Sequence, residues 1–210
     1  MSLPNQIKTT FSLLHDEVLM AHYYWKLYEQ LYHSEKTIEL INNTAPNYFV
    51  LMQRLVVSHT YLTLSKLSDR EKQNKEQTNL SLSKLLNEIK SIRSDQFVEE
   101  IENMISNFKE ECADFRSHRN KHLAHFDFET KQGSIKLPEI EKTKIKATLK
   151  LLADILNTIN KEYEEATQAY EHIISRWDAD SLIERLQESE RYRELKKEGV
   201  IPMHEDIYRK

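Results

Sequence analysis

The sequence contains very little glycine and proline. Only two of its 210 residues are glycine and four are proline, whereas average usage gives roughly 15 and 10 in a chain of this length. Phosphate-binding loops, dinucleotide-binding turns and nucleophile elbows need several glycines within one tight turn. β-Sandwiches and barrels need many hairpin turns. Two isolated glycines, Gly133 and Gly199, exclude these architectures and leave a helical protein with few breaks.

Cysteine is also scarce, and long apolar runs are absent. The single Cys112 has no partner for an internal disulfide, and no cationic stretch followed by an apolar one stands near Met1. We therefore expect a cytoplasmic protein in a reducing compartment. The most apolar run, residues 48–67, is interrupted by charged side chains such as Arg54 and Lys66, so no membrane association is expected. The net charge is −4, so any nucleic-acid binding has to be local.

Apolar residues recur at alternating steps of three and four, which is the spacing of packed helices. Two long segments, residues 47–132 and 139–198, contain neither glycine nor proline. The pattern predicts an all-α fold, a bundle of four to five long helices with shorter helices and a charged C-terminal helix. The predicted segments are helices over residues 6–33, 44–68, 81–92 and 94–125, a short helix after Ser34, a solvated connection over 69–79 and a loop or small hairpin over 128–138.

Two predicted helices carry the core of this bundle. The helix over residues 44–68 is apolar on most faces and is predicted to be the most buried. The apolar pattern from Ile145 to Ile173 alternates steps of 4 and 3 throughout, which predicts one long helix in the bundle core or, alternatively, a face for a partner helix. Charge rises after this pattern, so we expect one domain over residues 1–176 and a helical, charged extension over 177–210.

One short segment gathers the side chains that carry chemistry. Residues 116–125 read RSHRNKHLAH and contain no acid, which makes them the candidate anion site of an acidic chain. Its cations and histidines are Arg116, Arg119, Lys121, His118, His122 and His125. The three histidines continue the apolar seam of the helix over 94–125. We therefore expect them on its core-facing side, where water, a ligand or polar partners must reach them. The alternative is that the apolar seam ends before His118, so that the three histidines lie at a solvated end of the helix.

Arg119, the polar Asn120 and His125 match the motif of the HEPN superfamily (higher eukaryote and prokaryote nucleotide-binding), an Arg and a polar residue with a His four to six residues beyond the Arg. The stretch RNKHLAHFD resembles the branch associated with bacterial abortive infection, called abortive-infection U-like. The resemblance covers residues 48–173. It implies a HEPN-like helical bundle that pairs into a homodimer, with the two motifs facing a shared cleft.

Many members of that superfamily are metal-independent endoribonucleases that act as toxins or antiviral defence proteins, and others are binding or scaffold modules. The resemblance therefore implies an enzyme that cleaves RNA without a cofactor or metal, with Arg119, Asn120 and His125 as catalytic residues. Some members pair with an antitoxin protein, a nucleotidyltransferase that modifies a Tyr two residues after the motif His. This chain has Asp127 at that position, so it departs from that pattern.

The residue types suit metal-free RNA cleavage. A His with a pKa near neutrality takes the proton of the 2′-hydroxyl, and an Arg holds the phosphate as charge builds on it. Asn120 is suited to orient the phosphate or the histidine, and Asp127 to fix the imidazole tautomer. The residues predicted to contact the substrate are Arg116, His118, Lys121, His122 and Asp127.

Geometry and competing functions leave alternatives open. On a regular helix Arg119 and His125 point about 120° apart with about 9 Å of rise, so either the helix unwinds near Leu123 or the site takes the two residues from different protomers. His118, His122 and His125 have the spacing of zinc ligands, but Arg119 stands where a HExxH motif has its Glu. A non-catalytic module that binds nucleic acid or a protein is the main alternative to a nuclease.

Overall fold

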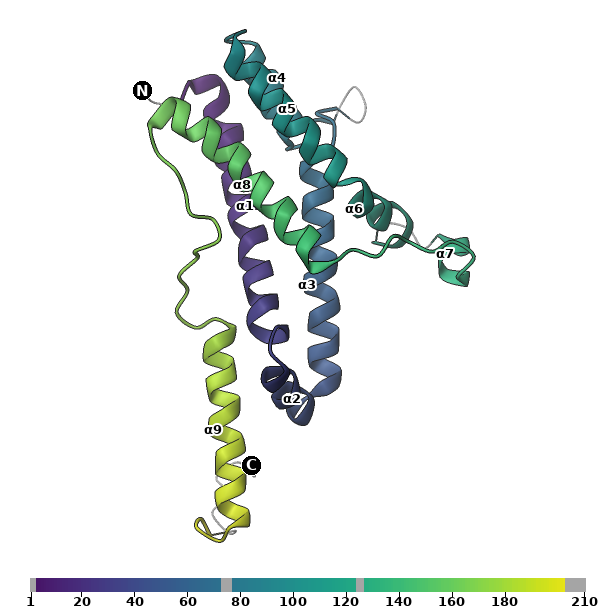
Figure 1. Cartoon of the computed structure of the whole chain (residues 1–210), viewed down its shortest axis with the longest axis vertical. Coiled ribbons are helices and arrows are strands. Elements are labelled where there is room, and N and C mark those ends of the chain that lie inside the picture. Colours follow the sequence, from purple (N-terminus) through teal and green to yellow (C-terminus); the bar gives the residue numbers. More distant parts are fainter. Residues whose placement is uncertain (1–2, 73–76, 124–126, 203–210) are drawn as a thin grey trace. The chain divides into compact units, whose positions relative to one another are not determined.

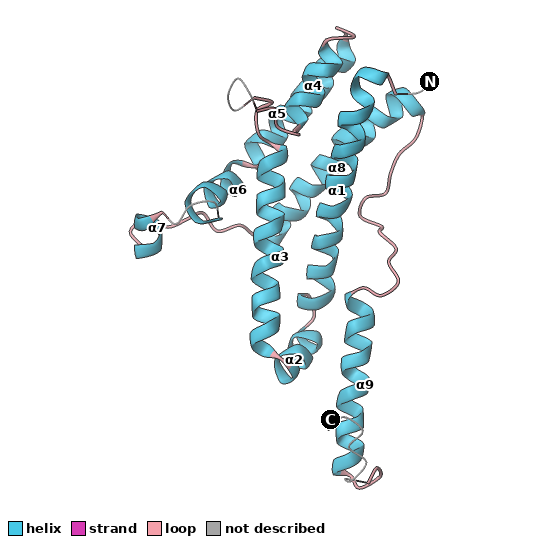
Figure 2. Ribbon diagram, turned by 180° about the vertical axis from the view of Figure 1, so that it is seen from behind, coloured by secondary structure: helices cyan, strands magenta, loops and turns pink. Residues whose placement is uncertain are grey.

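The computed structural model describes residues 3–72, 77–123 and 127–202. Within these ranges the regular structure is helical, apart from an isolated β-bridge between Lys72 and Thr78, as Figure 2 shows. The prediction of an all-α bundle with long helices is confirmed. The helices are α1 (Asn5–Tyr32), α2 (Glu35–Thr44), α3 (Pro46–Leu67), α4 (Leu82–Lys90), α5 (Gln96–Glu111), α6 (Ala113–His118), the π-helical turn η1 (Arg119–Leu123), α7 (Phe128–Gln132), α8 (Lys142–Glu164) and α9 (Ala179–Lys197).

Local sequence signals explain where several helices begin. Ser34 Oγ accepts a hydrogen bond from the Thr37 backbone N–H at 3.1 Å, and Ser81 Oγ accepts one from the Lys84 N–H at 3.4 Å. Such caps satisfy N–H groups that have no partner within the helix. Pro46 is the first residue of α3, a position where its missing N–H costs no hydrogen bond.

The chain divides into two compact units. The first comprises Met1–Trp25 and Val56–Ile173, and the second comprises Lys26–Leu55 and Ile174–Lys210. The division runs through α1 and α3, each of which contributes one end to each unit. It differs from the sequence-based division after residue 176 because α2 packs against α9 and so groups with the C-terminal segment.

In the first unit, α5 packs against both α4 and α8; α4 and α5 lie side by side in Figure 1. The apolar face of α8 is buried inside this unit. Its buried large apolar residues are Ile145, Leu149, Leu152, Ile155, Leu156, Ile159 and Tyr163. The prediction that this face belongs to the bundle core is therefore confirmed, and the alternative of a face left free for a partner helix is wrong.

The helix α8 ends at Glu164, well before the end of the apolar pattern. Glu165 adopts a left-handed conformation with φ of 55°, and the backbone beyond it pairs with a side chain of α8. The Gln168 N–H donates to Asn157 Oδ1 at 2.7 Å, and Asn157 Nδ2 donates to the Gln168 carbonyl at 2.9 Å. Tyr170 is only 1% exposed, but it reaches the core from this connection. The prediction of a helix up to residue 173 is therefore wrong.

Much of the first half of α3 is exposed, although Phe49 is buried. Tyr48, Leu51 and Leu55, spaced as one helical face, are 56%, 53% and 52% exposed. Leu64 and Leu67 in the second half are buried. The prediction that this helix is the most buried is wrong for its first half. That half belongs to the second unit, which has fewer helices to cover an apolar face.

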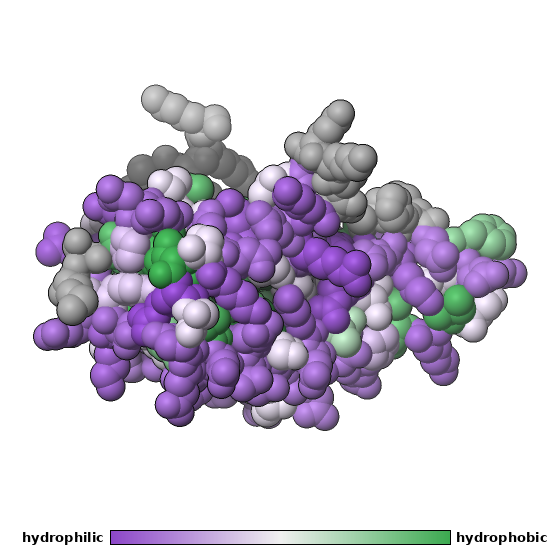
Figure 3. Space-filling view, turned by 90° about the horizontal axis from the view of Figure 1, so that it is seen from above, coloured by the Kyte–Doolittle hydropathy of each residue, from purple (hydrophilic) through white to green (hydrophobic). Residues whose placement is uncertain are grey.

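One face of the molecule is largely polar (Figure 3). The face drawn in Figure 3 is covered mainly by hydrophilic residues, with hydrophobic ones in separate small areas. None of the helices in the described ranges is long and apolar enough to span a membrane.

Candidate functional site

The segment predicted as one helix over residues 94–125 consists of three pieces. The helix α5 ends at Glu111, α6 covers Ala113–His118, and the π-helical turn η1 covers Arg119–Leu123. The buried residues that anchor α5 and α6 are Val98, Ile101, Ile105, Phe108, Cys112 and Phe115. A π-turn closes i→i+5 hydrogen bonds and frequently occurs at functional sites. The π-helical turn therefore begins at Arg119, the first residue of the predicted motif.

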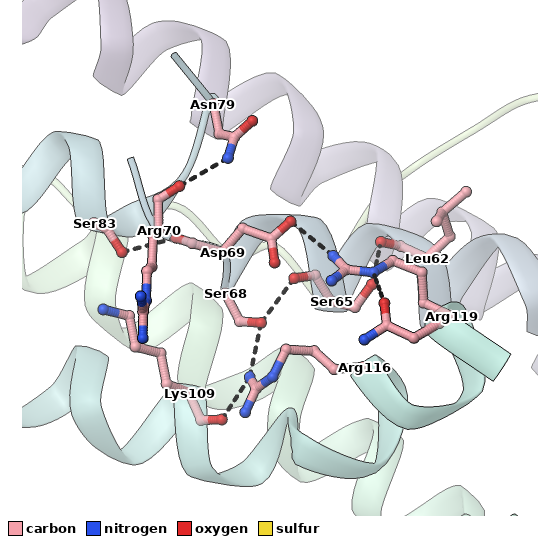
Figure 4. Close-up of polar contacts among 11 residues, drawn as sticks. Leu62, Ser65, Ser68, Asp69, Arg70, Asn79, Ser83, Lys109, Arg116 and Arg119 are labelled. Carbon is pink, nitrogen blue, oxygen red and sulfur yellow. Dashed lines mark hydrogen bonds and ion pairs between the residues drawn. The ribbon is translucent and has the colours of Figure 1, made fainter. Parts of the chain in front are cut away.

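Arg119 is held by two oxygen acceptors. Its Nη1 donates to Asp69 Oδ2 at 2.7 Å, and its Nε donates to Asn120 Oδ1 at 3.0 Å. Asp69 lies just beyond the C-terminal end of α3. The side chains of Arg119 and Asp69 are 19% and 27% exposed. The guanidinium is therefore oriented from two sides, and Figure 4 shows its contact with Asp69. Part of the Arg119 side chain remains exposed to a ligand.

Arg116 is also held in place, but by neutral groups. Its Nη1 donates to Ser68 Oγ at 3.0 Å and to the Lys109 carbonyl at 2.8 Å. The Ser68 hydroxyl in turn donates to the Ser65 carbonyl at 2.7 Å. These contacts fix the direction of the guanidinium without neutralising its charge.

Both arginines line a cavity of about 1050 Å³ in the first unit. The cavity lies between α1, the C-terminal half of α3, the connection after it, α5, α6 and η1. The charged residues of its lining are the cations Lys66, Arg70, Lys72, Lys109, Arg116 and Arg119 and the carboxylates Glu17 and Asp69. A surplus of positive charge is thus gathered in one cavity of a chain whose net charge is −4.

The sequence candidates did not include Lys66, Asp69, Arg70 or Lys109. Lys109 precedes Arg116 by seven residues, which places both on one face of a helix, so this spacing was a usable signal. The pKa of Lys109 is lowered by burial and by the positive charges of Arg116 and Arg70. The position of Arg70 carried no such signal, because residues 69–79 have no large apolar residue that predicts where the connection folds back.

The two described histidines of the motif segment do not line the cavity. His118 Nε2 donates to the Pro138 carbonyl at 2.7 Å, and its ring packs edge-on against Tyr61 with 5.2 Å between centroids. His118 therefore ties α6 to the segment before α8. His122 is exposed, and its pKa is lowered by partial desolvation and by the charges of Lys131 and His118. The expectation that the histidines extend the core-facing seam is wrong for His122.

The end of the predicted motif is described only in part. Asp127 Oδ1 accepts hydrogen bonds from the Thr130 N–H at 2.9 Å and the Thr130 hydroxyl at 2.6 Å. These bonds cap α7 and lower the pKa of the Asp127 carboxyl. The carbonyl of the half-buried Lys121 accepts the Asp127 N–H at 3.2 Å. His125 lies outside the described residues.

The structure thus separates the predicted site residues into two groups. Arg116, Arg119 and Asn120 line the cavity. His118, Lys121, His122 and Asp127 lie outside its described lining. In the ranges that the structure describes, no group of three or more His, Cys, Asp or Glu side chains is arranged to hold a metal ion.

An all-α bundle that carries an Arg–Asn pair at a π-turn agrees with the HEPN-type helical domain that the sequence resembles. The family model described as AbiU2, within the HEPN group, matches residues 5–189, and the chain belongs to this family. A comparison with curated proteins and a comparison with solved structures found no match.

Proposed function

We propose that this protein is a metal-independent endoribonuclease of the toxin or abortive-infection type. Membership of the AbiU2 family supports a role of this kind. The observation that carries the proposal is the placement of Arg119, whose guanidinium is oriented by Asp69 and Asn120 at the wall of a cation-rich cavity. A guanidinium that is permanently charged and fixed in direction is suited to stabilise the negative charge that builds on a phosphate in the transition state.

In this reaction His125 takes the proton of a ribose 2′-hydroxyl, and the 2′-oxygen attacks the adjacent phosphorus. The bond from phosphorus to the 5′-oxygen of the next nucleotide breaks, and that oxygen takes up a proton. The products are a 2′,3′-cyclic phosphate and a 5′-hydroxyl. Arg119 stabilises the charge on the phosphate oxygens, and Asn120 holds the guanidinium from its Nε side.

The test is cleavage of mixed RNAs by the purified full chain in the presence of EDTA. We expect cleavage by the wild type, products that end in a 2′,3′-cyclic phosphate, and loss of at least about 100-fold in rate for Arg119→Ala and for His125→Ala. His172→Ala, at an exposed position outside the motif, is the matched control and should cleave normally. Activity that EDTA abolishes, or that survives both motif substitutions, would refute the proposal.

The proposed enzyme acts as a homodimer with its motifs at a shared cleft. Mixing the inactive Arg119→Ala and His125→Ala chains tests how the site is composed. A site built from Arg119 of one protomer and His125 of its partner regains one intact copy in the mixed dimer, so activity returns. A site built within one chain stays inactive in the mixture. Sedimentation of the wild type checks the dimer itself.

A non-catalytic binding module is the second candidate function. It is favoured by the ion pair that already occupies Arg119, and the cations of the cavity suffice for binding a polyanion. Such a module binds RNA in the wild type and produces no cleaved ends under any of these conditions. The cleavage assay in EDTA therefore separates the two candidates directly.

A further inference from the structure

Three cations of the cavity form a group separate from the Asp69–Arg119 ion pair. They come from different segments: Arg70 from the connection after α3, Lys109 from α5 and Arg116 from α6. In the view of Figure 4, Arg70 and Lys109 lie at one end of the drawn side chains and Arg119 at the other, with Arg116 between them. This arrangement provides positive charge at a second place along the same cavity.

The charges of this group act on one another. Burial and the neighbouring charges of Arg116 and Arg70 lower the pKa of Lys109, and Glu102 opposes this in part, which is the direction expected for like charges gathered in one cavity. The described acceptors of Arg116, the Ser68 hydroxyl and the Lys109 carbonyl, are both neutral, so no carboxylate among them offsets its charge. A bound anion relieves this repulsion, and a fixed guanidinium loses little freedom when it binds one.

We propose that Arg70, Lys109 and Arg116 form a phosphate-binding subsite next to the phosphate held by Arg119. The identity of the ligand rests on the proposed function: it is the neighbouring phosphodiester of the same RNA strand. Arg116 and Arg119 are three residues apart, at the junction of α6 and η1, and residues with this helical spacing have neighbouring side chains. One strand therefore reaches both arginines at once. The subsite binds substrate and takes no part in proton transfer.

The test measures RNA binding by the full chain carrying His125→Ala, so that cleavage does not interfere. The probe is a short fluorescein-labelled single-stranded RNA, and the readout is anisotropy at several salt concentrations. In this background we compare the double variant Arg70→Gln/Lys109→Gln with Lys8→Gln/Lys161→Gln. The control pair removes two exposed lysines outside the cavity lining, so both double variants change the net charge equally.

We expect the Arg70→Gln/Lys109→Gln chain to bind RNA about 10- to 100-fold more weakly. Its plot of log K against log salt should lose about 0.7 in slope for the phosphate contact removed. The control pair should match the parent chain. Thermal unfolding followed by circular dichroism checks that both double variants are folded. Equal affinity and equal slope in the two double variants would overturn the subsite.

Inorganic phosphate, measured by calorimetry, separates RNA from a free anion as the source of the phosphate. If the substitutions abolish phosphate binding and leave RNA binding unchanged, the RNA assignment is overturned. The nuclease proposal can fail separately. If the wild type binds RNA through this subsite and never cleaves it, the nuclease proposal is refuted and the subsite proposal stands. Conversely, suppose that cleavage requires Arg119 and His125 while substitution of Arg70 and Lys109 changes neither RNA affinity nor KM. That result supports the nuclease proposal and refutes the subsite.

Discussion

Arg119 Nη1 lies 2.7 Å from Asp69 Oδ2, which joins the π-turn of the motif to the second residue after α3. The two residues are 50 positions apart in the sequence. The carboxylate orients the guanidinium and also occupies one of the donors that a phosphate would use. Asp69 therefore controls both the direction and the availability of Arg119.

Substitution of Asp69 by Asn tests this double role. The amide keeps an oxygen acceptor but removes a negative charge from the cavity, so we expect RNA to bind about 3- to 10-fold more tightly at low salt. The free energy of unfolding should fall by at most about 1 kcal/mol, because the ion pair is partly exposed. Anisotropy and urea denaturation measure the two effects. Glu100→Gln, at an exposed position of α5, is the control for net charge. Weaker binding by Asp69→Asn would contradict the competition between carboxylate and phosphate.

The stability of the first unit should depend on pH through His22. This side chain is 8% exposed, its Nε2 donates to the Leu149 carbonyl at 3.1 Å, and its ring stacks on Tyr170. Burial lowers the pKa of His22 below the ordinary value of about 6.5 for a histidine. The unfolded chain therefore binds this proton more readily, so the His22 contribution is complete above about pH 6.5 and is lost as the pH falls through the folded pKa.

Urea denaturation at pH 7.5 and pH 5.5 measures this contribution. We expect the free energy of unfolding to decrease towards the lower pH by up to about 1.4 kcal/mol per pH unit from this one group. His22→Gln should be less stable at pH 7.5 and should show a smaller decrease. His33→Gln, at an exposed position, should keep the full decrease. An undiminished decrease in His22→Gln would assign the effect to other groups.

The thiol of Cys112 should be inert in the folded protein. Cys112 is fully buried, and burial raises the pKa of its thiol to about 12. Because the thiolate is the reacting form, we expect no labelling by a disulfide reagent at pH 8 and complete labelling in denaturant. Cys112→Ser should lower the free energy of unfolding by about 1–2 kcal/mol, since it adds a buried hydroxyl. Labelling of the native protein at the rate of the unfolded chain would contradict this burial.

Asn157 should determine how the connection after α8 is held. Its side-chain amide makes two hydrogen bonds to the backbone of Gln168. Asn157→Ala removes both, with an expected loss of about 1–2 kcal/mol in the free energy of unfolding. Limited proteolysis should then cut the segment after Glu165 faster than in the wild type. Lys161→Ala, an exposed substitution on the same helix, should leave both quantities unchanged.

Part of the fold followed directly from short-range patterns. Ser34 and Ser81 cap α2 and α4, because a cap depends only on residues a few positions apart. The same patterns failed where side chains from distant turns compete with the helix. The apolar spacing continues to Tyr170, but Asn157 pairs with the backbone beyond Glu165 and α8 ends.

The sequence by itself determined the all-α class, because scarce glycine and apolar steps of three and four leave few other ways to bury the chain. It also located Arg116, Arg119 and Asn120. Only the tertiary structure decided that Asp69 holds Arg119 and that Arg70 shares its cavity. The physical reason is that these residues are far apart along the chain. Their neighbours are determined by how buried apolar faces pack elsewhere in the bundle. The charged positions themselves therefore carry no periodic pattern that predicts the contacts.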